Sequence, residues 1–503
     1  MSSPEMPASS IATSPLDATT TIRKYTEEAQ KRDPRVDHDA LNALVPSLKD
    51  EDKAKVIILG GGFSALLAAV RLIQQGFDAD DIRLVDSAGG FGVTWYWNRF
   101  PGLHCDVESY VYLPFLEETC HVPRKRYSPG YEIMEHVNRI ADHWNLTDKA
   151  LFRAKVTGLV WNEASKEWMV SLTEDRGPGQ DARDIKVKAQ YFILTSGLLS
   201  RPQIPNIPGL ESFGGDMFHT ARWNWTVTGG TPTDSDMTKL KDKRVGITST
   251  GGTAIQAVPS LARNAKELIV FQRTPSAVSP REQQDTDPVE WATKIATHKG
   301  WQADRMDRFI SRRPRGRVPS TPEAISAHIA EFVALDLPYG QRTRAWVDEI
   351  VKVKDTATKL KAWYPSWCKR PTFSDEYLQV FNLPNVHLNS CDGCRNGATL
   401  EDKWEKQGPT TMHGIMSRSF PNLFWFGGLH TGSASNYAHM VDVQARHMAY
   451  VLGETKMRDA AVVEVTVEGE ESWSTELCAQ GSLVHCGPNV HSGMLQPRRG
   501  DVW

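Results

Sequence analysis

A glycine-rich turn between a short apolar run and a helix-favouring segment constrains the fold more than any other feature of the chain. Residues 56–59 read Val-Ile-Ile-Leu, and three glycines follow before an alanine- and leucine-rich segment that reaches Gln75. A second apolar run at residues 82–85 ends at Asp86. A strand, a tight turn, a helix and a second strand within about 30 residues form a βαβ unit. The sequence therefore predicts an α/β fold that opens with a parallel sheet.

The turn of this first unit has the pattern of a dinucleotide-binding loop. Gly60 and Gly62 allow the backbone to turn sharply and to approach a pyrophosphate at a helix N-terminus. Ala65 occupies the third motif position, where alanine is tolerated when helix and strand pack closely. Asp86 can accept hydrogen bonds from the hydroxyls of a ribose. An ordinary glycine turn is the alternative, but strand, helix and acid together favour a nucleotide site.

A second unit of the same kind begins at Arg244. An apolar strand at residues 245–247 enters a turn of Thr, Ser and Gly, a helical segment follows to Asn264, and residues 268–271 form the next strand. Between the two units, residues 191–194 read Tyr-Phe-Ile-Leu, as a strand returning to the first sheet should. We therefore expect two Rossmann-like folds, with the second inserted into the first.

The turn of the second unit departs from the motif at its first glycine, where Ser249 stands. A Cβ at this position moves the pyrophosphate away or demands strained dihedral angles, although Gly251 still permits close approach. The following strand ends in Gln272, Arg273 and Thr274 rather than in an acid. An arginine there pairs with a 2′-phosphate, which favours NADPH over NADH. The alternative is a structural arginine on the surface.

Length and charge exclude several other classes of protein. The 503 residues exceed the size of a single hydrophobic core, and the net charge of −3 provides no basic surface for nucleic acid. No apolar stretch reaches the roughly 20 residues that cross a bilayer, and the first residues do not resemble a secretion signal. We expect a cytoplasmic protein whose partners are small molecules. The sequence does not indicate an oligomeric state.

The seven cysteines are scattered at irregular spacing, which suits reduced thiols better than a disulfide framework. Cys391 and Cys394 form a CxxC pair. A structural zinc site needs four ligands, and neither a second CxxC nor a nearby His pair completes one. We therefore expect loop thiols at this pair and no bound metal.

Three further segments match the sequence patterns of a known family. Phe213, Gly215, His219 and Trp223 occupy the four spaced positions of a pattern F-x-G-x-x-x-H-x-x-x-W, whereas Asn224 stands where that pattern has Pro or Asp. The other two segments run from Thr94 to Tyr110 and through the sequence Trp-Cys-Lys-Arg-Pro at residues 367–371. In all three the chain resembles the Baeyer-Villiger monooxygenases, which are class B flavoproteins that use FAD and NADPH. The resemblance extends from about Arg23 to Tyr450. It is strongest to the branch with a long N-terminal extension, which oxidises bulky ketones.

The resemblance implies roles for individual residues. The residues that would line the flavin are Thr94, Trp95, Tyr96, Trp97, Asp106 and Tyr112. The residues that would face or hold NADPH are His104, Cys105, Asp106, Thr250, Gly251, Gly252, Thr253, Ala254, Ile255, Arg273 and Thr274. His219 and Trp223 would link the domains, and Asp106 would orient the catalytic Arg370.

The family's chemistry explains the arginine. NADPH reduces the flavin, O2 adds to it, and the resulting peroxide must stay anionic to attack a ketone. Arg370 stays protonated at any working pH, so it can stabilise this peroxide without protonating it. Preorganised charge of this kind contributes about 3 to 4 kcal/mol to lowering a barrier. The alternative for Asp106 and Arg370 is a structural ion pair between segments.

The resemblance also predicts the domain organisation. We expect a disordered tail at residues 1–21, followed by a helical extension with a linker at 22–53. The FAD domain is expected in two parts, at residues 54–215 and 396–467, and the NADP domain in two parts, at 216–280 and 361–395. We expect a helical cap at residues 281–360 and an irregular tail at 468–503.

Three departures from the family bear on activity. Val93 replaces a glycine next to the flavin segment, Ser249 replaces the glycine of the second turn, and a hairpin with a strand is missing after Leu388. The expected reaction is conversion of a bulky cyclic ketone to an ester or lactone, in keeping with secondary metabolism. Oxygenation at nitrogen or sulfur, which would not need Arg370, and a degenerate flavoprotein without activity are the alternatives.

Overall fold

The computed structural model describes residues 36–197, 213–311, 322–362, 370–390 and 437–458, together with isolated positions and short pieces such as residues 422–425. Several predicted features lie outside the described residues. They are the tail at residues 1–21, the CxxC pair, the segment after Leu388 in which a strand is expected to be missing, and the chain end from residue 473.

The first sheet contains the strands that the sequence predicts around the first glycine turn. Its parallel part has the order β3-β2-β1-β6, and β12 pairs with the end of β6. In register, Val56 lies beside Ile82 on one side and Tyr191 on the other. The antiparallel strands β5 and β4 extend the sheet from the first half of β6. The strands of this sheet are β1 (Lys53–Leu59), β2 (Ile82–Val85), β3 (Ala150–Leu151), β4 (Ala154–Asn162), β5 (Glu167–Glu174), β6 (Arg183–Leu194) and β12 (Leu423–Trp425).

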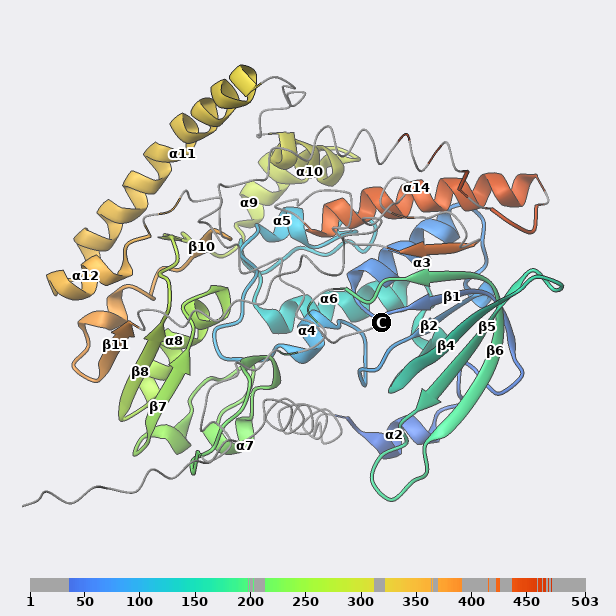
Figure 1. The fold of residues 1–503 in the computed structure, drawn as a ribbon, viewed down its shortest axis with the longest axis horizontal. Coiled ribbons are helices and arrows are strands. Elements are labelled where there is room, and N and C mark those ends of the chain that lie inside the picture. Colours follow the sequence, from blue (N-terminus) through green and yellow to red (C-terminus); the bar gives the residue numbers. More distant parts are fainter. Residues whose placement is uncertain are drawn as a thin grey trace, which may run out of the picture.

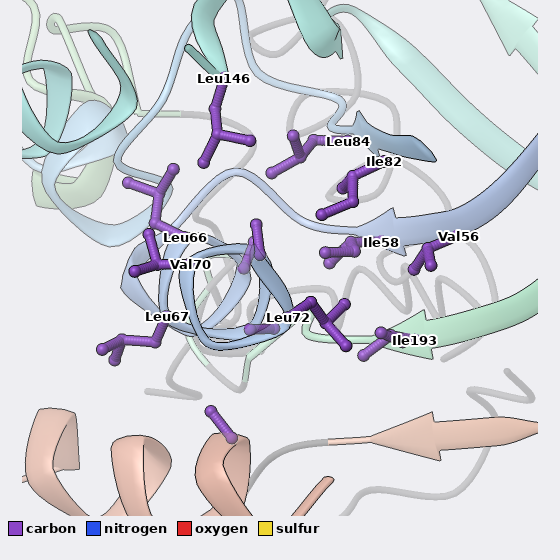
Figure 2. Close-up of a cluster of buried hydrophobic side chains, with 14 of the residues drawn as sticks. Val56, Ile58, Leu66, Leu67, Val70, Leu72, Ile82, Leu84, Leu146 and Ile193 are labelled. Carbon is purple, nitrogen blue, oxygen red and sulfur yellow. The ribbon is translucent and has the colours of Figure 1, made fainter. Parts of the chain in front are cut away.

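One helix, α3 (Phe63–Gln74), forms the core of this unit. Its alanines and leucines favour a helix and its N-cap is Gly62, where the turn ends. Leu66, Val70 and Leu72 are fully buried and belong to the same core as the strand residues that Figure 2 labels. The helix packs against α14 (Tyr437–Met457), and α6 (Gly130–His143) covers a neighbouring part of the same core.

The second sheet confirms the second predicted unit. Strands β7 (Arg244–Thr248), β8 (Glu267–Gln272) and β11 (Val386–Ser390) pair in parallel in the order β11-β8-β7, and α8 (Gly252–Asn264) connects the first two along the chain. The strands β9 (Val278–Ser279) and β10 (Thr372–Phe373) form a separate parallel pair. The two larger sheets lie at opposite ends of Figure 1, with α4 and α6 between them.

The remaining elements are short or helical. The helices α9, α10, α11 and α12 fall in the segment expected to form a cap, and α10 packs against α5 of the first unit. The elements are α2 (His38–Ala43), η1 (Ala79–Asp81), α4 (Thr94–Trp97), α5 (Ser109–Tyr112), η2 (Thr147–Lys149), η4 (Thr220–Arg222), α7 (Trp225–Thr228), η5 (Thr238–Leu240), α9 (Pro288–Glu290), the π-helix η6 (Trp291–Ile295), α10 (Trp301–Ser311), α11 (Pro322–Ile350), α12 (Lys354–Leu360) and η8 (Gln379–Asn382). The predicted α/β class with two parallel sheets is confirmed.

Candidate active site

The first glycine turn has a shape that only glycine can adopt. Gly60 has a φ of +135°, and a Cβ at this position would lie 2.4 Å from Thr195 Oγ1 and 2.9 Å from the carbonyl oxygen of Thr195. Any side chain would therefore collide with the end of β6. The backbone passes close to this strand end and enters α3 at Gly62. Ala65 is fully buried one turn later, so the small residue meets a packing demand.

Asp86 is held at the end of β2 by two backbone donors. The N–H of Gly61 donates to Oδ2 at 2.7 Å, and the N–H of Ala88 donates to Oδ1 at 2.7 Å. Burial raises the pKa of Asp86 to about 6 against these two hydrogen bonds, which lower it. A carboxylate next to the glycine turn retains free lone pairs for a ribose diol.

The expected flavin segment forms the short helix α4, whose residues Trp95, Tyr96 and Trp97 are buried. The indole N–H of Trp95 donates to the hydroxyl of Tyr112 at 3.0 Å. The ring of Tyr112 also meets the ring of Phe63, the first residue of α3, edge to face. The segment is thus fixed against the helix that begins at the glycine turn.

Val93, the N-cap residue of α4, has φ 42° and ψ −91°. This is a strained backbone conformation for a β-branched residue. The Val93 side chain also faces the turn, because a Cβ built on Gly62 would lie 3.4 Å from its Cβ and Cγ2. The branched side chain of Val93 therefore lies against the first glycine turn.

The second turn shows the strain expected at Ser249, whose φ is +125°. The hydroxyl of Ser249 accepts a hydrogen bond from the N–H of Gly251 at 3.1 Å. Thr250 is buried and donates to the carbonyl oxygen of Thr274 at 2.9 Å, which ties the turn to the end of β8. Arg273 is exposed beside Thr274. Among the described residues its guanidinium has no hydrogen-bond or ion-pair partner.

Asp106 and Arg370 meet in the structure. Arg370 donates from Nη2 to Asp106 Oδ2 at 2.9 Å, and these residues lie 264 positions apart in the chain. The Asp106 side chain is only 5% exposed, whereas that of Arg370 is 55% exposed. A Cβ built on Gly252 would lie 3.8 Å from Arg370 Nη1. The guanidinium therefore lies over the N-terminus of α8.

Two neighbours of Asp106 were missed by sequence reasoning. Arg281 donates from Nη2 to Asp106 Oδ1 at 2.8 Å, and Gln256 of α8 donates to the same oxygen at 3.2 Å. Gln256 also exchanges hydrogen bonds with the backbone of His104, at 3.1 Å in each direction. Neither residue belongs to a motif, and only the folded topology brings them to Asp106.

His104 and Cys105 are both kept uncharged by burial. Burial lowers the pKa of His104, whose Nδ1 lies 2.8 Å from the carbonyl oxygen of Gly102. Burial raises the pKa of the Cys105 thiol to about 12. This thiol is packed in an apolar cluster with Trp95 and Tyr110.

The segment containing His219 and Trp223 packs between the units. Its contacts with the expected flavin segment are made by Arg222 and Trp225 and not by His219 or Trp223 themselves. Trp223 is buried in the core of the second unit and donates to Thr228 at 3.2 Å, and His219 caps the turn that follows it. The guanidinium of Arg222 lies 3.8 Å from the ring centroid of Trp97. The indole N–H of Trp225 donates to the carbonyl oxygen of Arg99 at 3.1 Å. The aromatic sequence Trp-Asn-Trp was the available signal for this contact.

Comparison with known proteins identifies the family. No family model matches the chain. A polycyclic ketone monooxygenase from Thermothelomyces thermophilus is 46% identical over 545 residues, which cover 92% of this chain and 83% of the relative. The chain belongs to the Baeyer-Villiger monooxygenases. Because the alignment is longer than the whole chain of 503 residues, the relative carries internal segments that have no counterpart here.

Solved structures agree with this assignment. The structure of a polycyclic ketone monooxygenase from the thermophilic fungus Thermothelomyces thermophila matches with a TM-score of 0.83 and 43% identity, covering 93% of each chain. The monooxygenase OTEMO in complex with FAD and NADP shares the fold, with a TM-score of 0.66 and 23% identity over 86% of this chain and 92% of the other. The predicted monooxygenase class is confirmed, and a relative from Emericella nidulans that is 37% identical over 89% of this chain is named an FAD-binding monooxygenase.

The residues of this Baeyer-Villiger monooxygenase fit both cofactors. The close approach at Gly60 and the buried Asp86 suit the pyrophosphate and ribose of FAD. The turn before α8, with Arg273 beside it, suits NADPH. A cavity of about 650 Å³ adjoins the Asp106 cluster through His104, Gln256 and Arg281, but neither glycine turn lines it. Two of the predicted cofactor residues, Trp95 and His104, do line this cavity. Among the described residues, no helix is long and apolar enough to span a membrane.

Proposed function

We propose that this monooxygenase oxidises a bulky, polycyclic ketone to an ester or lactone, and that Arg370 and Asp106 carry the oxygen-insertion step. The similarity to a polycyclic ketone monooxygenase over 92% of the chain supports the substrate class. The overall reaction places one oxygen atom of O2 between the carbonyl carbon and a neighbouring carbon. The other atom leaves as water, and NADPH supplies two electrons.

The observation that carries the proposal is the Arg370–Asp106 contact over the N-terminus of α8. FAD, when bound, accepts hydride from NADPH and passes the electrons to O2. The Arg370 guanidinium then stabilises negative charge, first on the attacking oxygen and later on the former carbonyl oxygen of the substrate. Asp106 holds the guanidinium in place without removing its proton, because arginine stays charged at working pH.

The neighbours of the ion pair include a buried apolar cluster. Cys105, which precedes Asp106 in the chain, packs in this cluster with Trp95 of α4. His104 is kept neutral by burial, which lowers its pKa, so it does not add a proton donor of its own at neutral pH. Bound cofactors and substrate would cover the exposed part of Arg370, and exclusion of water strengthens its interaction with the oxygen anion and limits loss of hydrogen peroxide.

The test is the Arg370→Ala variant assayed with a polycyclic ketone and with a sulfide. Attack on a carbonyl needs the oxygen anion, whereas oxidation of a sulfide does not. We expect ketone oxidation to fall by about 10²- to 10³-fold while sulfide oxidation stays within a few-fold. The control is Arg244→Ala, which removes an exposed arginine paired with Glu267.

Two outcomes would contradict the proposal. An equal loss of both activities in Arg370→Ala would show that the arginine is not specific to the carbonyl reaction. Purified wild-type protein without a flavin absorbance band near about 450 nm, even after incubation with FAD, would favour the degenerate flavoprotein instead.

A further inference from the structure

We propose that Arg281 is a positioning residue that neutralises Asp106 and so leaves the charge of Arg370 available to the reacting oxygen. The inference rests on the proposed role of Arg370. It assigns a function to a buried arginine that lies in no motif and that the sequence did not single out.

Asp106 is shared between two arginines that differ in exposure. Arg281 is 9% exposed and donates to Oδ1, whereas Arg370 is 55% exposed and donates to Oδ2. Gln256 adds a second donor to Oδ1. One carboxylate oxygen is therefore held by buried groups, and the other is presented to the more exposed guanidinium. This arrangement fixes the carboxylate before Arg370 binds to it.

Arg281 also fixes the backbone from which Arg370 projects. Its Nη2 donates to the carbonyl oxygen of Phe373 at 2.9 Å, in strand β10, which begins two residues after Arg370. Its own backbone N–H donates to Asp375 Oδ1 at 2.8 Å. Arg281 itself follows β9, the strand that pairs with β10. A single side chain thus contacts both partners of the ion pair, the Asp106 carboxylate directly and Arg370 through its strand.

The charges of the cluster explain why a second arginine matters. Asp106 and Arg370 alone would form a neutral pair, and a neutral pair attracts an oxygen anion weakly. With Arg281 the three side chains carry a net charge of about +1 when all are ionised. The nearby Asp375 carboxylate is bound by three backbone N–H groups, those of Arg281, Glu282 and Gln283. Because Arg281 is buried and bound to Oδ1, its charge offsets that of Asp106. Arg370, which is 55% exposed, then presents the excess positive charge.

The experiment compares Arg281→Met, Arg281→Lys and the control Arg305→Met in full-length protein loaded with FAD. Methionine keeps much of the volume and removes the charge, whereas lysine keeps the charge. Arg305 is a matched control because it makes an ion pair of the same kind with Glu108, at 2.7 Å, two residues after Asp106. The measurements are bound FAD, the ratio of ketone to sulfide oxidation, and hydrogen peroxide formed per NADPH consumed.

We expect Arg281→Met to bind FAD and to consume NADPH, but to lose about 10- to 100-fold in ketone oxidation with sulfide oxidation within about threefold. Hydrogen peroxide should account for most of the NADPH consumed. Arg281→Lys should recover at least part of the ketone-to-sulfide ratio, and Arg305→Met should leave that ratio unchanged.

An unchanged ratio in Arg281→Met would overturn the inference, as would equal losses in Arg281→Met and Arg281→Lys or in Arg281→Met and Arg305→Met. If Arg281→Met does not fold, Arg281→Gln takes its place in the comparison with Arg281→Lys, because glutamine also removes the charge. Failure of the proposed function is separate. It would appear as an unchanged ketone-to-sulfide ratio in Arg370→Ala, whatever the Arg281 variants do.

Discussion

The buried carboxylate of Asp86 accepts a hydrogen bond at 2.7 Å from the backbone N–H of Gly61, which ties the acid at the end of β2 to the glycine turn. Burial raises the pKa of this carboxyl to about 6, above its ordinary value of 3.8. Below this pH the folded apoprotein carries a protonated Asp86, and a protonated oxygen is a poorer acceptor for a ribose hydroxyl. The affinity for FAD should therefore depend on pH near this value.

We predict that the dissociation constant of FAD is constant above about pH 7 and rises about tenfold for each pH unit below about 6. The free energy of unfolding of the apoprotein changes with pH in the opposite direction, because burial of Asp86 favours its protonated form. The stability that a protonated Asp86 provides at low pH is lost as the pH rises through about 6. Fluorescence titration of apoprotein with FAD between pH 5 and pH 8 measures the effect. Asp86→Asn should bind FAD weakly at every pH, and an equal slope in this variant would contradict the prediction.

Val93→Gly should stabilise the protein. The φ of 42° and ψ of −91° at Val93 cost about 1 to 3 kcal/mol, whereas glycine at an ordinary position costs about 0.5 to 1 kcal/mol in backbone entropy. The net expected gain is about 1 kcal/mol in the free energy of unfolding, visible as a higher melting temperature. Tighter FAD binding should accompany it, because the side chain beside Gly62 is removed.

Asn145→Gly is the control for Val93→Gly. Asn145 has a φ of 53°, but asparagine tolerates a left-handed backbone far better than valine does. We expect a change of only a few tenths of a kcal/mol in either direction. A Val93→Gly variant that melts below the wild type would show that the packing of the Val93 side chain outweighs the backbone strain.

Local patterns were sufficient to predict the central parallel strands β1, β2 and β6 of the first sheet and the strands β7 and β8 of the second, but not the antiparallel strands β4 and β5. The strands at residues 56–59, 82–85 and 191–194 are buried apolar runs, and burial on both faces produces such runs in parallel sheets. The strain at Ser249 also follows from the sequence. The turn requires a positive φ at the position of its first glycine, and the backbone keeps this φ when serine replaces the glycine. These features depend on a few neighbouring residues, and the sequence carries them directly.

The environment of Asp106 could be predicted only in part. Its contact with Arg370 was expected from the resemblance of each segment to the family, not from spacing. Arg281 lies 175 positions from Asp106 in the chain and follows a two-residue strand that has no local pattern. Its role depends on how β9 and β10 pair and on how the two units pack, and neither is encoded in a short motif.

Arg273 should decide between NADPH and NADH. Its guanidinium is exposed beside the turn that begins α8, where it can bind a phosphate without losing another partner. Hydrogen bonds to charged groups contribute about 1.5 to 3 kcal/mol, so Arg273→Ala should raise the KM for NADPH by about 10- to 100-fold. The KM for NADH should change by less than about threefold. Steady-state kinetics with both cofactors measures the ratio, and equal changes for both would favour a structural role.

Ser249→Gly should strengthen NADPH binding for two separable reasons. The φ of +125° is strained for serine, and the Ser249 hydroxyl occupies the N–H of Gly251, a donor that the pyrophosphate needs. Glycine removes both obstacles, and a gain of about 1 kcal/mol corresponds to an affinity about fivefold higher. Ser249→Ala frees the N–H but keeps the strained Cβ, so its affinity should lie between those of the wild type and the glycine variant. Calorimetric titration with NADP+ gives the three affinities, and FAD content serves as the control because the first turn is unchanged. If the glycine and alanine variants bind NADP+ equally tightly and both bind it more tightly than the wild type, the hydroxyl rather than the backbone strain limits binding. If neither variant differs from the wild type, the departure at Ser249 has no effect on cofactor affinity and the prediction is wrong.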